Sequence, residues 1–148
     1  MRIQDIMSRR VASVTSETAA ETAWNLMQSR SIHHLVVTDG GRPVGVVSAR
    51  DLGGRRGSGT RKGQTVAELM SASPVTARPE TTLRQAANLM RGRAIGCLPV
   101  LDRGKLVGIV TVTDLLELIG RGHDRPPTRA QRGLMRGRPP GLRWRGGR

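Results

Sequence analysis

The sequence predicts an α/β (α+β) fold made of two copies of a β-α-β-β-α unit, and three observations support this prediction. One block of 46 residues occurs twice without a gap, at an offset of 63 residues. Each copy holds one segment with the apolar spacing of an amphipathic helix. Each copy also holds two short aliphatic runs joined by a Gly-containing turn, which is the pattern of a β-hairpin.

The repeat places residues 7–52 on residues 70–115. Many aligned positions are identical, and a gapless match of this length does not arise by chance. The identical pairs include Met7/Met70, Ser8/Ser71, Glu17/Glu80, Asn25/Asn88, Leu26/Leu89, Met27/Met90, Ile32/Ile95, Leu35/Leu98, Asp39/Asp102, Gly45/Gly108 and Asp51/Asp114. The chain of 148 residues is therefore expected to fold as two very small, equivalent units.

A helix is predicted in the middle of each block. The apolar residues that define it recur at the i, i+3, i+4 and i+7 positions of one helix face. They are Ala19, Ala20, Ala23, Trp24 and Met27 in the first copy and Leu83, Ala86, Ala87 and Met90 in the second. Thr18 with Glu21, and Thr82 with Gln85, have the spacing of an N-terminal capping box. Trp24 lies on the apolar face and is expected in the core.

Short aliphatic runs predict three strands in each unit. The expected strands comprise residues 11–15, 35–37 and 44–47 in the first copy and residues 75–77, 98–101 and 106–110 in the second. Turns at residues 39–42 and 102–105 would join the last two strands of each copy into a hairpin. A second helix is expected after each hairpin, and its pattern is clearest at residues 114–119.

The expected organisation has four parts. Residues 1–55 form the first unit, residues 56–64 a Gly/Arg-rich linker, and residues 65–120 the second unit. Residues 121–148 form a tail rich in Arg, Gly and Pro. The composition of the linker and the tail is typical of mobile chain, and the tail is expected to be disordered.

The net charge of +14 belongs mainly to the linker and the tail. Residues 121–148 carry nine arginines and one aspartate, a net +8, while residues 53–65 carry three arginines and one lysine, a net +4. The tail arginines are Arg121, Arg125, Arg129, Arg132, Arg136, Arg138, Arg143, Arg145 and Arg148. One hypothesis is that they bind nucleic acid without sequence preference, with the repeats as a switch. A disordered solubilising tail is the favoured alternative, because the tail lacks elements that read bases.

Composition excludes several classes of function. Phe and Tyr are absent and the only aromatic residues are Trp24 and Trp144, so base stacking on aromatic platforms is nearly excluded. The single cysteine, Cys97, excludes an internal disulfide and a multi-cysteine zinc site. No secretory signal or membrane-spanning stretch is recognisable, so a cytoplasmic protein without membrane association is expected.

The second copy carries the motifs Met-Ser, a helix ending in Leu-Met, Leu-Pro-Val, Asp, Gly-Lys-Leu-Val-Gly-Ile-Val-Thr and Asp-Leu, nearly unbroken over residues 69–116. This pattern resembles the cystathionine-β-synthase (CBS) domain family, and the resemblance covers about residues 1–120. The first copy departs from it mildly. It has His33-His34-Leu35-Val36 where the second has Gly96-Cys97-Leu98-Pro99, and Ser48 in place of Thr111.

The resemblance implies that the two units pack sheet to sheet, around a pseudo-twofold axis. It implies up to two clefts that bind an adenine nucleotide, with AMP or ATP expected first, or a related adenosyl ligand. It also implies a homodimer of a regulatory sensor that acts on an unknown protein partner in trans. No catalytic cofactor is implied, and CBS pairs found in enzymes accompany a separate catalytic domain.

The central site motif is Gly-apolar-apolar-Thr/Ser-x-x-Asp, which runs from Gly45 through Ser48 to Asp51, and from Gly108 through Thr111 to Asp114. A helix that starts at such a motif offers free N–H groups to a phosphate, and the hydroxyl adds a donor. Under the resemblance, each aspartate accepts hydrogen bonds from ribose hydroxyls, and each glycine allows a close backbone approach. The alternative is that hydroxyl and carboxylate merely cap the helix.

The resemblance adds further candidate contacts. Ser13 and Thr76 lie where the first strand supplies a polar contact, and His34 and Cys97 lie where the chain passes the adenine. Apolar walls would come from Val14, Ile32, Val75 and Ile95. The alternative for all of these is packing alone.

The basic residues near the motif could neutralise nucleotide phosphates, since Arg makes bidentate phosphate contacts. They are Arg50, Arg55, Arg56, Arg61 and Lys62. A solvated linker is the alternative for the last four. His33, His34 and Cys97 raise the question of a zinc site, but structural zinc needs about four ligands, so no metal is expected.

An enzyme is not expected. No nucleophile, base and orienting group recur together in the sequence, and residues 57–63 lack the spacing of a phosphate-binding P-loop. The sequence therefore favours a binding module over a catalyst.

Overall fold

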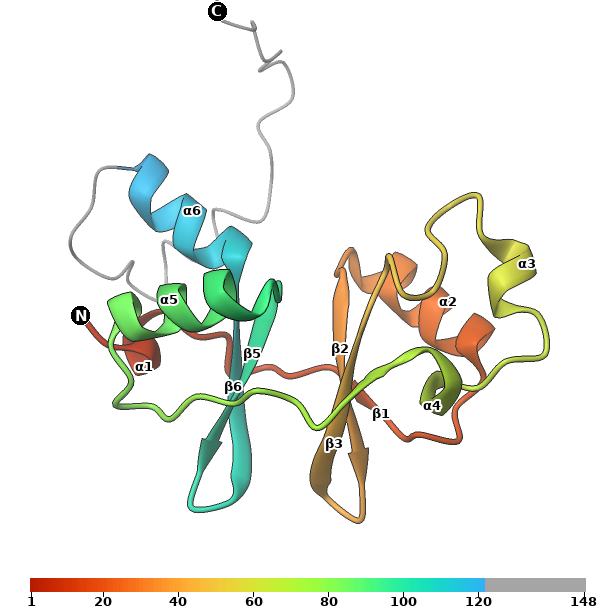
Figure 1. Ribbon diagram of the computed structural model, residues 1–148, viewed down its shortest axis with the longest axis horizontal. Coiled ribbons are helices and arrows are strands. Elements are labelled where there is room, and N and C mark those ends of the chain that lie inside the picture. Colours follow the sequence, from red (N-terminus) through yellow and green to blue (C-terminus); the bar gives the residue numbers. More distant parts are fainter. Residues whose placement is uncertain (122–148) are drawn as a thin grey trace, which may run out of the picture.

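The computed structural model describes residues 1–121, and it confirms the mixed α+β prediction (Figure 1). Two hairpins lie in the middle of the molecule, and the helices α2 and α5 lie outside them, one on each side. The first unit contains α2 (Ala20–Arg30), β2 (His34–Asp39) and β3 (Arg42–Ser48), and the second contains α5 (Leu83–Arg93), β5 (Cys97–Asp102) and β6 (Lys105–Thr111). The Arg-rich tail and its proposed nucleic-acid contact lie outside the described residues.

The two hairpins have the same internal geometry. Each turn has both central residues at positive φ, +58° and +79° at Gly40 and Gly41 and +51° and +79° at Arg103 and Gly104. A two-residue hairpin turn of this kind matches the twist of the strands it joins. Each hairpin also has one irregularity of register, at the same position of the repeat. The predicted hairpins are confirmed.

Short strands extend each hairpin. β1 (Ser13–Val14) runs parallel to β2, and β4 (Ser71–Ala72) runs antiparallel to β3, which gives a sheet with the order β1-β2-β3-β4. In the second unit single bridges occupy the equivalent places, Ala77 with Val100 and Ser8 with Ile109. Both units therefore have the same strand order.

The first turn of each repeat packs on the other unit. α1 (Ile3–Ile6) supplies Ile3, at 0% exposure, to the core that contains β5 and β6. α4 (Val66–Leu69) supplies Val66, also at 0% exposure, to the core that contains β2 and β3. Backbone bonds of 2.8 Å fix both segments, from Ile3 N–H to the Thr81 carbonyl and from Val66 N–H to the Thr18 carbonyl. The start of each sequence repeat thus completes the opposite unit.

Two aliphatic cores result, with Trp24 as their only aromatic residue. The buried side chains of the first are Ala20, Ala23, Trp24, Met27, Leu35, Val37, Val47, Leu52 and Val66. Those of the second are Ile3, Ile6, Met7, Ala77, Ala86, Met90, Leu98, Val100 and Val110. The prediction that Trp24 is a core residue is confirmed, since it is 9% exposed.

One of the two predicted capping boxes is wrong. Thr82 and Gln85 form the expected box, with N–H to oxygen distances of 3.0 and 3.2 Å. α2 instead begins after Ala19, while Thr18 makes a hydrogen bond to Thr15. The repeat equivalent of Thr82 is Ala19, which has no hydroxyl, so the first helix has no side-chain cap.

The second helix of the unit is present only in the second copy. α6 (Val112–Gly120) follows β6, whereas a turn at residues 49–53 follows β3. Gly53 and Gly54 have φ values of +90° and +66°, a left-handed conformation that ends a right-handed helix. Their repeat equivalents are Leu116 and Glu117, which continue α6. The predicted β-α-β-β-α unit is therefore wrong in its last helix for the first copy.

The linker between the units is ordered around one arginine. It contains the short helix α3 (Ser58–Arg61), and Arg61 is only 4% exposed. The expectation of a solvated linker is wrong at this residue, although Arg55, Arg56 and Lys62 are exposed. Within residues 1–121, no helix has the length and apolar character needed to cross a membrane.

Candidate functional site

The two hydroxyl-x-x-Asp motifs lie at the ends of β3 and β6. Ser48 is the last residue of β3 and pairs across the hairpin with His34, and Thr111 is the last residue of β6 and pairs with Cys97. The hairpin register therefore brings the predicted hydroxyl and the predicted adenine-side residue together in each unit. Ser48, Asp51, Thr111 and Asp114 are all partly buried.

Each aspartate closes a capping box with the hydroxyl residue three positions before it. Oδ2 of Asp51 accepts from Ser48 N–H at 2.8 Å, and Ser48 Oγ accepts from Asp51 N–H at 3.1 Å. The bonds between Thr111 and Asp114 are 2.8 and 3.2 Å long. Helix capping, the alternative interpretation of the motif, is thus confirmed for Thr111 and Asp114, whereas the same pair of bonds in the first unit closes a turn. These bonds also fix one oxygen of each carboxylate and so orient the side chain before any ligand arrives.

The helix N-terminus offers less to a phosphate than the motif predicts. At α6 the Val112 N–H donates to the Gly96 carbonyl at 3.0 Å, and the Asp114 N–H donates to Thr111. In the first unit the Ala49 N–H donates to the His33 carbonyl at 2.9 Å, and no helix follows. The idea of a free helix N-terminus for phosphate is therefore wrong for the first motif, and only a small part of it remains for the second.

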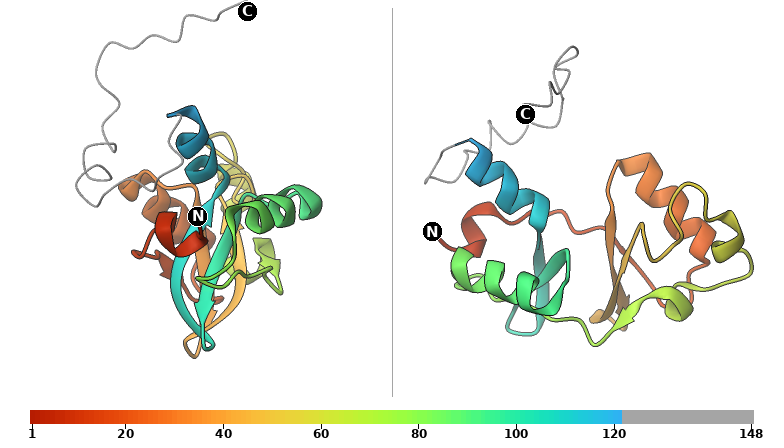
Figure 2. Two further views of the ribbon diagram at one scale, coloured as in Figure 1. Left: turned by 90° about the vertical axis from the view of Figure 1, so that its left-hand side faces the viewer. Right: turned by 45° about the horizontal axis from the view of Figure 1, so that its top comes forward.

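The two hairpins lie side by side (Figure 2), and β3 contacts β6. A Cβ atom added to Gly96 of the second unit would lie 3.0 Å from His34 Nε2 of the first. The imidazole of His34 thus packs against the backbone of the other unit. The residue that precedes Cys97 and the residue that pairs with Ser48 are in contact, so the candidate site includes residues from both repeats.

Burial changes the acid–base properties of both adenine-side residues. It lowers the pKa of His34, His33 lowers it further, and the Asp51 carboxylate opposes the change. Burial, together with the Asp51 charge, raises the pKa of Cys97 to about 12. The Cys97 thiol therefore stays protonated near neutral pH and behaves as a small apolar group. The electrostatic contribution of Asp51 to both residues places its carboxylate near the junction of the units.

We expect the lowered pKa of His34 to make stability depend on pH. The unfolded chain takes up a proton at His34 near pH 6.5, whereas the folded protein does so only at lower pH. The stability contributed by neutral His34 is thus present above pH 6.5 and is lost as the pH falls through the folded pKa. Urea unfolding between about pH 7.5 and 5 should show this loss, and His34→Gln should reduce it.

The matched control for this titration is His33→Gln, because His33 is exposed. It should retain most of the pH dependence, since burial is the larger cause of the change at His34. Asp39, whose pKa is lowered by hydrogen bonds from Ser16, affects stability only below its ordinary value of 3.8. An equal reduction in both histidine variants would contradict the assignment to His34.

The remaining predicted contacts are placed less favourably. Ser13, Thr76 and Arg50 are exposed, and their side chains make no hydrogen bond to any residue within 1–121. The four residues predicted as apolar walls of the cleft pack against the cores, as expected if they serve packing and not ligand contact. They are Val14 and Ile32 on the first core and Val75 and Ile95 on the second.

The close approach at the two motif glycines is made by the protein itself. A Cβ at Gly45 would lie 2.6 Å from Met70 Sδ and 2.8 Å from the Ser71 carbonyl oxygen. A Cβ at Gly108 would lie 2.5 Å from Met7 Sδ. These glycines admit the first turn of the opposite repeat, which accounts for their lack of a side chain without a ligand.

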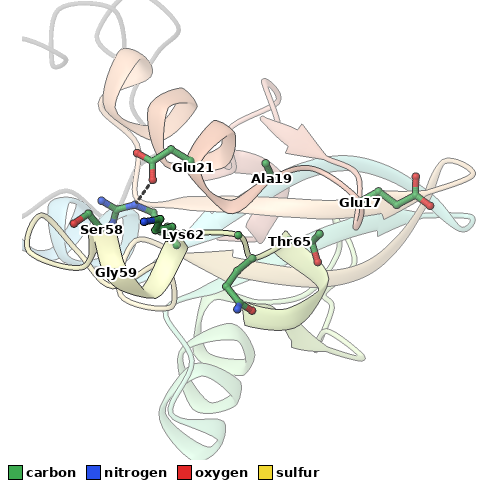
Figure 3. Close-up of a pocket in the computed structure, with 10 residues that line it drawn as sticks. Glu17, Ala19, Glu21, Ser58, Gly59, Lys62 and Thr65 are labelled. Carbon is green, nitrogen blue, oxygen red and sulfur yellow. Dashed lines mark hydrogen bonds and ion pairs between the residues drawn. The ribbon is translucent and has the colours of Figure 1, made fainter.

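A separate hollow of about 680 Å³ lies between α2 and the linker (Figure 3). Glu17, Glu21, Ser58, Lys62 and Thr65 are among the residues that line it. Of the residues predicted to contact a nucleotide, only Arg61 and Lys62, predicted to neutralise its phosphates, line this hollow. Among His, Cys, Asp and Glu of the described chain, no three residues gather closely enough to hold a metal ion.

Sequence reasoning missed Arg61 and the role of Glu21. Arg61 lies in a Gly-rich stretch that has no apolar periodicity, and nothing in the local pattern marks it as buried. Its partner Glu21 had been placed in a capping box. The departure of residues 53 and 54 from the repeat was the one available signal, because glycines there replace helical residues of the second copy.

Comparison with known proteins gives a consistent result. The sequence model of the CBS domain family matches residues 3–52 and 66–121 of this chain. The chain is 34% identical over 114 residues to the CBS domain-containing protein YhcV of Bacillus subtilis, which covers 76% of this chain and 81% of that protein. It is also 32% identical over 116 residues to the inosine-5'-monophosphate dehydrogenase of Thermoplasma acidophilum, but the match covers only 23% of that enzyme.

Solved structures match over most of their length. The CBS domain pair of protein MJ0100, in complex with 5'-methylthioadenosine and S-adenosyl-L-methionine, superposes with a TM-score of 0.75 at 26% identity. The superposition covers 83% of this chain and 98% of the MJ0100 domain pair. The structure of CBSX2 in complex with AMP has a TM-score of 0.69 at 30% identity and covers 81% of this chain and 96% of its own.

Proposed function

The chain belongs to the CBS domain family, and we propose that it is a non-catalytic regulatory module that binds an adenine nucleotide between its two units. Binding would change the packing of the units and so the engagement of a protein partner in trans. The observation that carries the proposal is the pair of partly buried, backbone-anchored carboxylates, Asp51 and Asp114, at the ends of the central strands. Relatives of the same fold bind AMP and adenosyl compounds, which supports it.

The chemistry of the site suits an adenosine group. A carboxylate whose one oxygen is fixed by the backbone can accept hydrogen bonds from vicinal ribose hydroxyls, and charge-assisted bonds of this kind are strong. His34 and Cys97, whose thiol is protonated, are paired directly across the hairpins with Ser48 and Thr111. Adenine would lie against them and against aliphatic side chains. Because α6 has few free N–H groups, recognition would depend on the nucleoside more than on its phosphates.

We expect substitution of either aspartate by Asn to weaken binding at its own site about tenfold, through loss of a charge-assisted hydrogen bond. Asn retains an oxygen for the cap, so the variants should remain folded. Titration of Asp51→Asn, Asp114→Asn and the double variant with adenosine, AMP, ADP and ATP in a calorimeter measures the effect.

Asp102→Asn is the matched control, because Asp102 is an exposed carboxylate at a hairpin turn. It should bind as the parent protein does. If the parent protein gives no heat and no shift in melting temperature with any of the four ligands, the proposed function fails. If both site variants bind all ligands normally, the ligand lies elsewhere.

We also propose that the module is a homodimer formed through α6. Leu116 and Ile119 are 61% and 74% exposed, and with Val112 at 38% they form a stripe at i, i+4 and i+7 on one face of this helix. The first unit has no equivalent apolar stripe, because it has no helix equivalent to α6. A twofold pairing of α6 with its copy would cover it.

Leu116→Lys is expected to convert such a dimer to a monomer, because two lysines would meet at the twofold axis. Sedimentation equilibrium of the full chain measures the mass. Glu117→Lys changes the charge of an exposed neighbour on α6 and serves as the control. A parent protein that is monomeric at all concentrations tested would contradict the proposal.

A further inference from the structure

The two candidate sites are built on different supports. In the second unit the Thr111 to Asp114 motif opens a helix of nine residues. In the first unit the Ser48 to Asp51 motif opens only a turn. Backbone hydrogen bonds close this turn, from the N–H groups of Leu52, Gly53 and Gly54 to the carbonyls of residues 48, 50 and 49, but no helix continues from it. The Leu52 carbonyl, directly after Asp51, therefore has no following helical N–H to accept from, and a group from elsewhere in the chain can fix it.

Arg61 is in position to do so. Its Nη1 donates to the Leu52 carbonyl at 2.8 Å and to the Gly54 carbonyl at 2.7 Å. Its Nε donates to Glu21 Oε2 at 3.1 Å, and the guanidinium carbon lies 4.3 Å from the centre of the Trp24 ring. The side chain is 4% exposed, so these contacts are made away from solvent. Leu52 is the residue directly after Asp51.

The second unit shows what Arg61 replaces. The repeat equivalent of Gly54 is Glu117, and the Glu117 carbonyl accepts from the Arg121 N–H at 3.2 Å as part of the end of α6. In the first unit the equivalent carbonyl accepts from the Arg61 side chain at 2.7 Å and from the Gly57 N–H at 3.2 Å. The shorter of the two bonds that replace the helical one thus comes from a guanidinium group. Its planar fork allows one side chain to reach two carbonyls and a carboxylate.

We propose that Arg61 is the positioning residue of the first nucleotide site: it holds the turn that carries Asp51 in the geometry that α6 imposes on Asp114. This inference rests on the proposed function. It makes residues 53–65 part of the support of the first site, since they are joined to the turn by the Arg61 side chain and by backbone hydrogen bonds. It also connects that site to Trp24, which the guanidinium covers.

The binding test uses Arg61→Lys in two backgrounds, with AMP as the ligand. Asp114→Asn leaves only the first site intact, and Asp51→Asn leaves only the second. Lysine keeps the positive charge, but its single nitrogen cannot take the places of both Nη1, which bonds the two carbonyls, and Nε, which bonds Glu21. We expect Arg61→Lys to weaken AMP binding about tenfold in the first background and less than twofold in the second. Ser58→Ala, an exposed position on α3, is the control and should change neither.

Hydrogen exchange tests the positioning without a ligand. In the unliganded full chain, Arg61→Lys should speed exchange of the amides of residues 51–54 at least tenfold and leave those of residues 114–117 unchanged. An equal effect on both AMP sites, or on neither, would overturn the proposal, and so would unchanged exchange at residues 51–54. If the parent chain binds no AMP, the proposed function fails while the exchange result still decides whether Arg61 positions the turn.

Discussion

Ile3→Ala is expected to destabilise the second unit, although Ile3 lies within residues 1–55, the predicted first unit. The side chain is 0% exposed and packs in the core that contains Leu98 and Val110. Removal of a buried Ile side chain costs about 2–5 kcal/mol, because transfer energy is lost and a cavity remains. We expect the loss in urea unfolding, and we expect hydrogen exchange to speed first in β5 and β6.

The repeat supplies a reciprocal variant and a control for this prediction. Val66 is the repeat equivalent of Ile3 and is also 0% exposed, but it packs against the first core. Val66→Ala should therefore speed exchange first in β2 and β3. Gln4→Ala changes an exposed residue of α1 and should have little effect. If Ile3→Ala weakened β2 and β3 first, the packing of each first turn on the opposite unit would be wrong.

Arg61→Met is expected to lower the free energy of unfolding by about 3 kcal/mol. Methionine fills much of the same volume but leaves the buried Leu52 carbonyl without its donor and the Gly54 carbonyl with only the Gly57 N–H, and a buried unsatisfied group costs about 1–3 kcal/mol. Loss of the guanidinium contact should also change Trp24 emission in the folded protein. Urea unfolding followed by tryptophan fluorescence measures both effects.

Glu21→Gln separates the carbonyl contacts from the ion pair. The Glu21 side chain is 54% exposed, so its pair with Arg61 is largely screened and its removal should cost less than about 1 kcal/mol. If Glu21→Gln cost as much as Arg61→Met, the ion pair and not the two carbonyls would hold the linker. An Arg61→Met protein as stable as the parent would mean that neither does.

Much of the fold could be predicted because the signals are local. The spacing of apolar residues in each block predicts α2 and α5, and the Gly-containing turns predict both hairpins. The hydroxyl-x-x-Asp spacing predicts a cap, and Ser48 with Asp51 and Thr111 with Asp114 form it. In each case the residues that decide the structure lie within four positions of one another.

Two predictions were wrong, the cap at Thr18 and the last helix of the first unit. The first was wrong because a residue next to the true N-cap position has similar chemistry, and the second because the two repeats differ in sequence there. Thr18 has the right chemistry for a cap but lies one position too early, and the true N-cap position holds Ala19. The last helix of the first unit was inferred from the second, yet Gly53 and Gly54 adopt left-handed conformations that no helix contains. In both cases residues close in the sequence, Ala19 for the cap and Gly53 and Gly54 for the helix, decide the local structure.

Residue types at short, fixed spacing specify the repeat, the two hairpins, the main helices and the backbone-bonded aspartates Asp51 and Asp114, and these features can be recognised in the sequence. The folded chain alone shows which core receives Ile3 and which receives Val66, where Arg61 lies, and that His34 contacts Gly96 of the other unit. These choices depend on contacts between residues far apart in the chain. An apolar first turn or a linker arginine carries no local mark of the partner that will bury it.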